Sequence, residues 1–166
     1  GLLRISDLEK THFAREYFVK RRLPTQAFDH FFFSPTFKSW VRAEGYEAGW
    51  VDMPNVPDDA RLVIPWYTPQ GVFQGLQARA LTPSPSALRY LTLKVDPNIE
   101  TVYGLDRLRL TSPIYIVEGP LDSWFLPNAL AAMSASRMLA VYRTYALGGH
   151  VTMVWDNEPR NRQILH

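Results

Sequence analysis

Ile114-Tyr115-Ile116-Val117-Glu118-Gly119-Pro120-Leu121-Asp122 is the stretch that decides the fold. Its apolar, β-branched start has the pattern of a buried parallel strand, which ends at a carboxylate, a turn and a second carboxylate. The pattern returns at Val151–Glu158, where a similar run ends in Asp156 and Glu158. Open α/β sheets place their ligands at the carboxyl ends of their strands. We therefore expect both acidic clusters at one edge of a parallel sheet.

The acidic residues of the C-terminal third are concentrated in these two clusters. Between Thr111 and His166 the sequence has no other Asp or Glu. Acids that serve only solubility are usually spread over the surface, so solvated loop acids are the weaker interpretation. Carboxylates gathered at one sheet edge repel each other unless a cation lies between them. Their hard oxygen ligands suit Mg²⁺ or Mn²⁺.

The composition of the chain limits its possible fold class, compartment and chemistry. The 166 residues are 46% hydrophobic and 20% charged, as expected for a folded globular chain of one domain or two small subdomains. No transmembrane or signal-peptide pattern is visible, which makes the cytoplasm the default compartment. The absence of cysteine excludes disulfides, a zinc ribbon and thiol catalysis within this stretch. A net charge of +2 permits nucleic-acid binding without requiring it.

The first two thirds of the chain read as mixed helix and strand. Ser6 and Glu9 form a capping-box pattern that predicts a helix over Asp7–Arg22. Asp58 and Asp59 lie among Gly and Pro residues, where solvated loop acids are expected. Apolar runs bounded by turn residues predict strands at Phe31–Phe33, Leu62–Tyr67, Val72–Leu81 and Arg89–Lys94, the last with Tyr90, Thr92 and Lys94 on one face.

After the opening motif, helices alternate with apolar runs. Pro120–Ala129 and Arg137–Leu147 suit helices, and Val151–Trp155 suits a strand. Ala129–Ser134 fits either a buried strand or the end of the preceding helix. The order of elements favours a parallel, doubly wound sheet.

Several short motifs, taken in order, resemble the catalytic core of bacterial-type and tailed-phage DNA primases, which contains a TOPRIM domain. They are Arg61-Leu-Val-Ile-Pro65, Gly75-Leu-Gln-Ala-Arg79, Arg89-Tyr-Leu91, Tyr103-Gly-Leu-Asp106, Glu118-Gly-Pro-Leu-Asp122 and Asp156-Asn-Glu158. Each motif is short, but the spacing and the preceding hairpin add specificity.

The resemblance implies an α/β fold in two parts. Residues 1–108 would form an α+β N-terminal subdomain, and residues 109–166 a TOPRIM parallel-sheet domain. The sheet is expected to be incomplete at its C-terminus, so the chain is expected to be a fragment of a longer polypeptide. The implied activity is metal-dependent synthesis of RNA primers during phage or bacterial replication, in the cytoplasm of the bacterial host if a phage encodes it.

The resemblance also implies roles for individual residues. Glu118 and Asp122 would be catalytic, and Glu118 would hold Mg²⁺ or Mn²⁺ together with Asp156 and Glu158. Most cellular relatives have two aspartates at the last pair, so Glu158 departs from their pattern. The residues expected to bind nucleotide or template are Arg79, Arg89 and Lys94, the positively charged side chains of the hairpin region.

The implied partners are a single-stranded DNA template, ribonucleoside triphosphates and a replicative helicase, with no membrane. Two alternatives use the same fold. A TOPRIM nuclease would use the same acids to activate water, but the upstream hairpin and the Arg89-Tyr-Leu91 segment favour a primase. A catalytically silent nucleic-acid-binding or replisome-scaffold domain would tolerate loss of the acids, whereas an enzyme would not.

Overall fold

A computed structural model of the chain describes residues 1–82 and 88–156. The chain divides into two compact units. One contains Gly1–Pro65 and Gln74–Pro97, and the other contains Trp66–Phe73 and Asn98–His166. Within the described ranges, no helix combines the length and the apolar character that crossing a bilayer requires.

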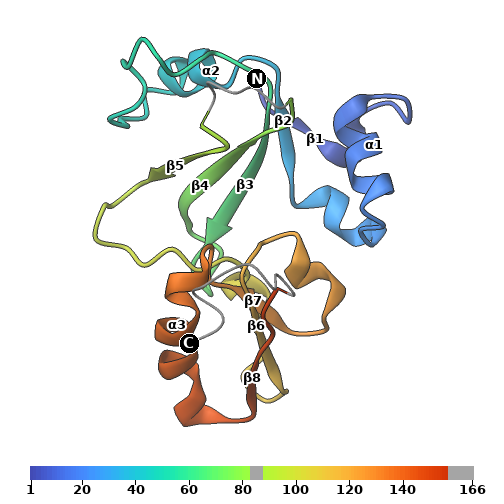
Figure 1. The fold of residues 1–166 in the computed structure, drawn as a ribbon, viewed down its shortest axis with the longest axis vertical. Helices are drawn as coiled ribbons and strands as arrows, with labels where there is room; N and C mark the ends of the chain where they lie inside the picture. Colours follow the sequence, from blue (N-terminus) through green and yellow to red (C-terminus); the bar gives the residue numbers. More distant parts are fainter. Residues whose placement is uncertain (83–87, 157–166) are drawn as a thin grey trace. The chain divides into compact units, whose positions relative to one another are not determined.

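The first unit is built on a five-stranded sheet with the strand order β1-β2-β3-β4-β5 (Figure 1). β1 pairs antiparallel with β2, β2 with β3, and β4 with β5. Residues Arg61 to Trp66 of β3 are all buried, so this central strand is covered on both faces. The strands are β1 (Leu3–Arg4), β2 (Phe32–Ser34), β3 (Arg61–Tyr67), β4 (Phe73–Ala80) and β5 (Tyr90–Lys94).

Two α-helices, α1 (Phe13–Lys20) and α2 (Phe37–Ala43), lie on different sides of β2 in Figure 1. A 3₁₀ turn, η2 (Thr25–Asp29), follows α1. The ring of Phe18 meets the rings of Phe28 and Phe31, each at a centroid distance of 5.2 Å. Edge-on contacts of this kind are favourable between aromatic rings. The aromatic residues between α1 and β2 therefore form much of this core.

The first helix begins later than predicted. Ile5–Asp7 forms a separate 3₁₀ turn, η1, and the prediction of a helix from Asp7 is wrong. Ser6 hydrogen-bonds the side chain of Asp7 at 3.4 Å and does not cap α1. The cap is His12, whose Nδ1 accepts a hydrogen bond of 3.2 Å from the backbone N–H of Ala14. An acceptor at this position satisfies an N–H group that the first helical turn leaves without a partner.

Asp58 is an exposed loop acid, as predicted, whereas Asp59 is half-buried, and both side chains have defined partners. Asp58 accepts hydrogen bonds from the backbone N–H of Ser39 at 3.1 Å and from its hydroxyl at 2.5 Å, and so caps the start of α2. Asp59 forms a two-point ion pair with Arg61, at 2.6 and 3.1 Å. Local composition predicts a loop correctly, but it does not show which side chains the loop meets.

Arg61 is wholly buried at the start of β3. Besides Asp59, its guanidinium reaches the carbonyl oxygens of Ala78 in β4 at 3.2 Å and Leu88 at 3.0 Å. A buried charge is tolerated only when it is paired and hydrogen-bonded, and both conditions are met here. Arg61 therefore ties the start of β3 to β4 and to the segment that leads into β5.

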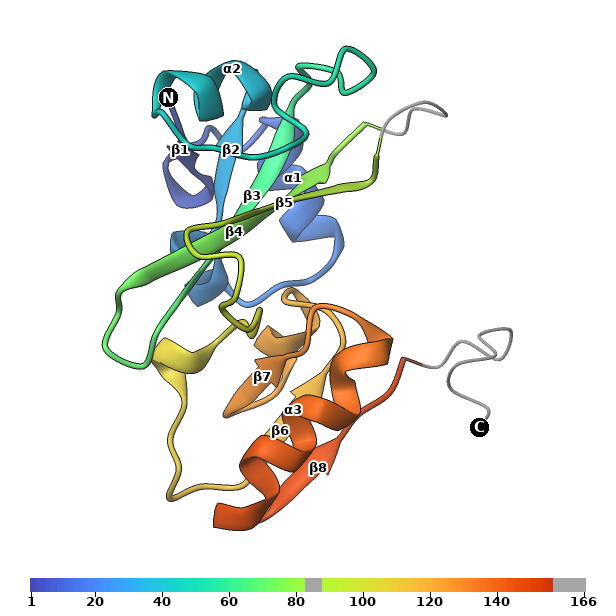
Figure 2. The same cartoon turned by 90° about the vertical axis from the view of Figure 1, so that its left-hand side faces the viewer.

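The second unit contains a parallel sheet with the order β7-β6-β8. β6 (Ile114–Val117) lies between β7 (Ala129–Ala131) and β8 (Val151–Met153). Helix α3 (Met138–Tyr145) packs against β6 and β8, as Figure 2 shows. Shorter 3₁₀ turns complete the unit: η3 (Leu105–Arg107), η4 (Asp122–Phe125), η5 (Ala135–Arg137) and η6 (Ala146–Gly148).

Ile114 and Ile116 of β6 share one buried cluster with Leu130 of β7 and with Met138 and Val141 of α3. Alternate residues of a strand face the same side, so this cluster fixes which face of β6 the helix covers. The sequence left open whether Ala129–Ser134 is a buried strand or the end of a helix. The first three residues of this segment form the buried strand β7.

The helix predicted over Pro120–Ala129 is wrong except for the single turn η4. Leu126, which follows η4, is extended, with φ −120° and ψ 145°. It precedes Pro127, and a residue before proline is driven out of the helical region by the proline ring. The chain therefore leaves the helix early enough to begin β7 at Ala129.

Asn128 closes the loop that leads into β6. Its Nδ2 donates to the carbonyl oxygens of Arg109 at 2.8 Å and Pro113 at 2.9 Å, with a longer contact of 3.3 Å to Ser112. Its Oδ1 accepts from the backbone N–H of Arg109 at 2.8 Å. Asn128 has a positive φ of 113°, and Asn is one of the residues that most often adopts such a value.

Candidate active site

Glu118 and Asp156 follow neighbouring parallel strands. Ile116 of β6 is the register partner of Met153 of β8, and the backbone N–H of Val154 donates to the carbonyl of Ile116 at 2.8 Å. Glu118 comes two residues after Ile116, and Asp156 comes three residues after Met153. Because parallel strands end at the same sheet edge, both residues belong to one edge of this sheet, as predicted.

The turn from Glu118 to Asp122 is fixed by backbone hydrogen bonds. The carbonyl of Glu118 accepts from the N–H of Met133 at 2.9 Å, and the carbonyl of Gly119 accepts from Asp122 at 3.1 Å and from Ser123 at 3.3 Å. The Glu118 and Asp122 side chains are both half-buried. The turn therefore holds the backbone of both carboxylate-bearing residues in a defined position.

Gly119 leaves room for the second acid of the motif. A Cβ atom at position 119 would meet the carboxylate of Asp122, which folds back over the turn. The atoms met belong to the free end of the Asp122 side chain, so a larger residue at position 119 would displace this carboxylate without disturbing the backbone. Glycine at position 119 is therefore compatible with the observed direction of the Asp122 side chain.

The acidic edge supplies donors of the right kind for a hard divalent cation. Asp156 is exposed, and Glu158 lies outside the described residues. Among residues 1–82 and 88–156, no three His, Asp or Glu side chains form a group that could hold a metal by themselves. Mg²⁺ usually takes one or two carboxylates and completes its shell with water and substrate phosphates. Two carboxylates at one edge are compatible with that mode of binding.

Arg79 and Tyr90 lie directly opposite each other on β4 and β5. The Arg79 guanidinium lies 5.7 Å from the centre of the Tyr90 ring and 5.4 Å from that of Tyr17 on α1. Arg89 approaches the Tyr90 ring at 5.6 Å. Tyr90 is 39% exposed, which leaves part of its ring open to solvent. The strand register confirms the predicted common face of Tyr90, Thr92 and Lys94, because their partners on β4 are also alternate residues.

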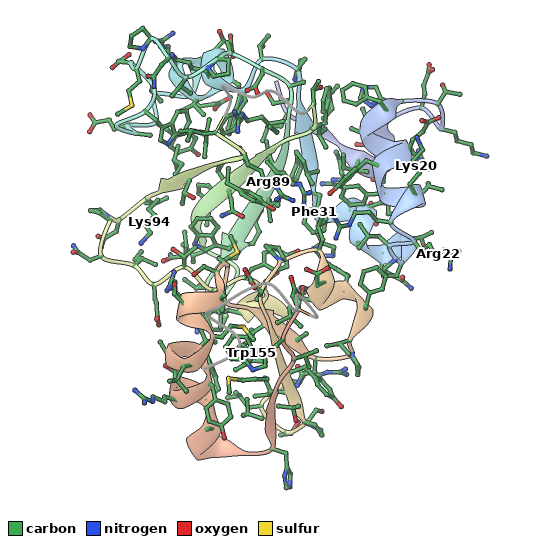
Figure 3. All side chains as sticks on the ribbon, viewed as in Figure 1. Lys20, Arg22, Phe31, Arg89, Lys94 and Trp155 are labelled. Atoms are coloured by element: carbon green, nitrogen blue, oxygen red, sulfur yellow. The ribbon has the colours of Figure 1, made fainter. Side chains whose placement is uncertain are left out.

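Arg89 directly precedes β5, and Lys94 is its last residue (Figure 3). Five residue steps along a strand separate them by roughly 17 Å, so they cannot bind the same phosphate group. Nζ of Lys94 donates to the carbonyl of Pro97 at 3.3 Å. Sequence reasoning missed Tyr17 and Arg21, which extend this surface, with Arg21 at 5.6 Å from the Tyr17 ring. Both residues lie in the helix predicted over Asp7–Arg22, but that prediction did not indicate that Tyr17 meets cationic neighbours.

A second group missed from the sequence lies beside the acidic turn. The Arg107 guanidinium lies 3.8 Å from the centre of the Trp124 ring and 5.2 Å from that of Tyr103. Nε1 of Trp124 donates to the Tyr103 hydroxyl at 2.9 Å. Burial raises the pKa of Tyr103 well above its usual range, although Arg107 and the Trp124 hydrogen bond act in the opposite direction. The motif at Tyr103-Gly104 was visible in the sequence, but it did not predict that Arg107 and Trp124 pack against Tyr103.

Gly104 allows this group to pack against β7. It has a φ of 96°, and a Cβ at this position would lie 2.8 Å from the carbonyl oxygen of Ala129. Tyr103, next to it, forms a two-way backbone bridge with Ala131 at 3.0 Å in both directions. A glycine is required here by both the backbone conformation and the close approach.

Comparison with known proteins places this geometry in context. No protein-family model matches the chain. The chain is 28% identical over 165 residues to the DNA primase of Enterobacteria phage T4, a match that covers 98% of the chain. It spans less than half, 45%, of that relative's length.

Two solved structures share the fold. The Aquifex aeolicus primase, comprising its zinc-binding and RNA polymerase domains, matches with a TM-score of 0.66 and 17% identity, over 94% of this chain and 45% of that one. The DnaG primase catalytic domain bound to single-stranded DNA matches with a TM-score of 0.59 and 17% identity, over 92% of this chain and 56% of that one. The chain is therefore similar in sequence to a phage DNA primase and shares the fold of solved primase catalytic cores.

Proposed function

We propose that the chain forms the catalytic core of a DNA primase, which joins ribonucleotides into a primer on single-stranded DNA. The observation that carries the proposal is the sheet edge shared by Glu118 and Asp156, in a chain related to a primase over nearly all of its length. Phosphoryl transfer depends on positioning and on electrostatic stabilisation of the phosphate oxygens, and a cation held at such an edge contributes to both.

The proposed roles follow from position. Glu118, Asp156 and Glu158 would hold Mg²⁺ or Mn²⁺, and Glu118 and Asp122 are the proposed catalytic carboxylates. When bound, the cation would neutralise triphosphate oxygens and lower the pKa of the attacking 3′-hydroxyl. The half-buried carboxylate of Glu118 is suited to accept the proton that the hydroxyl loses.

We propose that the surface around β5, in the first unit, binds nucleotide or template. Arg79, Arg89 and Lys94 supply positive charge, and the partly exposed ring of Tyr90 offers a stacking surface for a base. A related DnaG domain has been solved with single-stranded DNA bound, which supports this choice of ligand. Ribonucleoside triphosphates and a replicative helicase are the other proposed partners.

The test is ribonucleotide oligomer synthesis on single-stranded DNA by the native protein, with Mg²⁺ or Mn²⁺. We expect Glu118→Gln and Asp156→Asn to abolish most of the synthesis. The matched control, Glu47→Gln, changes an exposed acid of the first unit and should leave synthesis unchanged. Full synthesis by both acid variants would refute the catalytic assignment. Template cleavage without synthesis would identify a nuclease instead.

A further inference from the structure

Arg107 is held by two aromatic rings and a hydroxyl group. Its guanidinium covers the ring of Trp124, and its Nη2 lies 3.4 Å from the hydroxyl oxygen of Ser123. Planar stacking of this kind needs a guanidinium, because an ammonium group has neither the shape nor the fixed donor geometry.

These contacts lead directly into the acidic turn. Ser123 is wholly buried, and its hydroxyl donates a hydrogen bond of 2.6 Å to the carbonyl of Pro120. Trp124 is anchored through Nε1 to the hydroxyl of buried Tyr103. Both residues belong to η4, which begins at Asp122. Arg107 therefore contacts the two residues that immediately follow this carboxylate.

A single 3₁₀ turn has little stability of its own, because its hydrogen bonds are few and poorly aligned. The direction of the Asp122 side chain, folded over Gly119, depends on the backbone of this turn. The cluster of Arg107, Trp124 and Tyr103 adds side-chain packing to the backbone hydrogen bonds of the turn and to the contacts of η4 with β6 and β7.

We propose that Arg107 is a positioning residue, which acts through Trp124 and Ser123 to hold the Glu118–Asp122 turn in its metal-binding geometry. This inference rests on the proposed function of the acidic edge. Residues that orient the groups around a metal typically change metal affinity or activity by about 10- to 100-fold when they are removed.

The experiment compares Arg107→Ala and Arg107→Lys with Arg143→Ala, which removes an exposed arginine of α3 in the same unit. Mn²⁺ binding is measured by calorimetry in the absence of nucleotide, and kcat, KM and thermal unfolding are measured in parallel. We expect Arg107→Ala to weaken Mn²⁺ binding and to lower kcat by roughly 10- to 100-fold, with an unchanged KM for the template. Arg107→Lys should not restore either quantity, and Arg143→Ala should match the unchanged protein.

A second pair of variants separates the ring from its hydrogen bond. Trp124→Phe keeps a surface for the guanidinium and loses only the bond to Tyr103, so its effect should be smaller than that of Trp124→Ala. Unchanged Mn²⁺ affinity and kcat in Arg107→Ala, even with a lower Tm, would overturn the proposal. So would a rise in the KM for nucleotide alone that Arg107→Lys restores, because that result identifies a direct nucleotide contact.

The two proposals fail in different ways. Mn²⁺ binding that Arg107→Ala weakens, in a protein that makes no primers, would refute the primase function and keep the positioning role. Primer synthesis that is insensitive to Arg107→Ala would refute the positioning role and keep the primase function. A protein that neither binds Mn²⁺ nor makes primers would refute both.

Discussion

Nε1 of Trp124 donates a hydrogen bond of 2.9 Å to the hydroxyl of Tyr103, whose side chain is 4% exposed. A Tyr hydroxyl at such a depth needs a partner, because an unsatisfied buried polar group costs free energy. The pair joins the segment before η3 to the turn that carries Asp122. A side-chain hydrogen bond thus fixes η4 to a segment that is distant from it in sequence.

The buried hydroxyl predicts an alkaline limit to stability. Burial raises the folded-state pKa of Tyr103 above its ordinary value of 10.0. The unfolded chain therefore loses this proton first, and stability falls as the pH rises above about 10 toward the folded-state pKa. Urea unfolding at pH 8 to 11 should show a smaller alkaline loss for Tyr103→Phe than for the unchanged protein. Tyr142→Phe, a half-buried control, should not reduce that loss, and equal losses in all three proteins would contradict the prediction.

Two arginine ion pairs should differ sharply in their contributions to stability. Arg61 is wholly buried, and its truncation to alanine would leave Asp59 and two carbonyl groups without their donor. We expect Arg61→Ala to lower the free energy of unfolding by about 3–5 kcal/mol. Arg42 pairs with Asp52 at 3.3 Å, with side chains 51% and 91% exposed, so Asp52→Ala, which keeps the bond of Arg42 to the carbonyl of Val51, should cost less than about 1 kcal/mol. Chemical denaturation measures both, and similar costs would argue against the burial of Arg61.

Gly119 and Asp122 should be energetically coupled. Gly119→Ala forces the Asp122 carboxylate away from the turn, whereas the same change in an Asp122→Ala background meets no carboxylate. A double-mutant cycle should therefore give a coupling of about 0.5–3 kcal/mol. Gly148→Ala is the control, since a Cβ there meets nothing within 4 Å. Additive costs for positions 119 and 122 would show that the carboxylate does not fold over the turn.

The arginines around Tyr90 should determine how DNA affinity depends on salt. Each phosphate contact to a single strand contributes about 0.7 to the slope of log affinity against log salt. Arg79→Ala and Arg89→Ala should each reduce the slope by roughly this amount if the side chain contacts one phosphate. Lys10→Ala, an exposed charge before α1, serves as the control and should leave the slope unchanged. Titration with a fluorescent oligonucleotide checks this, and identical slopes would place the template elsewhere.

Strands with strong periodicity were predictable from the sequence. The alternation in β5 identifies its buried face, and the apolar run of β6 identifies a buried strand, because each pattern depends on residues within one element. Helix starts were harder, because Ser6 and His12 both offer an acceptor and only packing selects between them. The fate of Asp59 was not predictable, since it depends on the depth of Arg61 in the sheet. The domain boundary after residue 108 and the roles of the acidic residues stay predictions.

Asn128 has a consequence for how the parallel strands align. Antiparallel neighbours can take their alignment from a tight turn, but a parallel pair such as β6 and β7 has no such turn. Asn128 immediately precedes β7, and Pro113 immediately precedes β6. The Asn128 amide donates hydrogen bonds to the carbonyl oxygens of Arg109 and Pro113. The Asn128 side chain thereby fixes the register of β6 against β7. A register slip of one residue would turn Ile114 and Ile116 of β6 away from α3. The side of the sheet to which Glu118 belongs therefore depends on the Asn128 amide, which lies at the end of the strands opposite to Glu118.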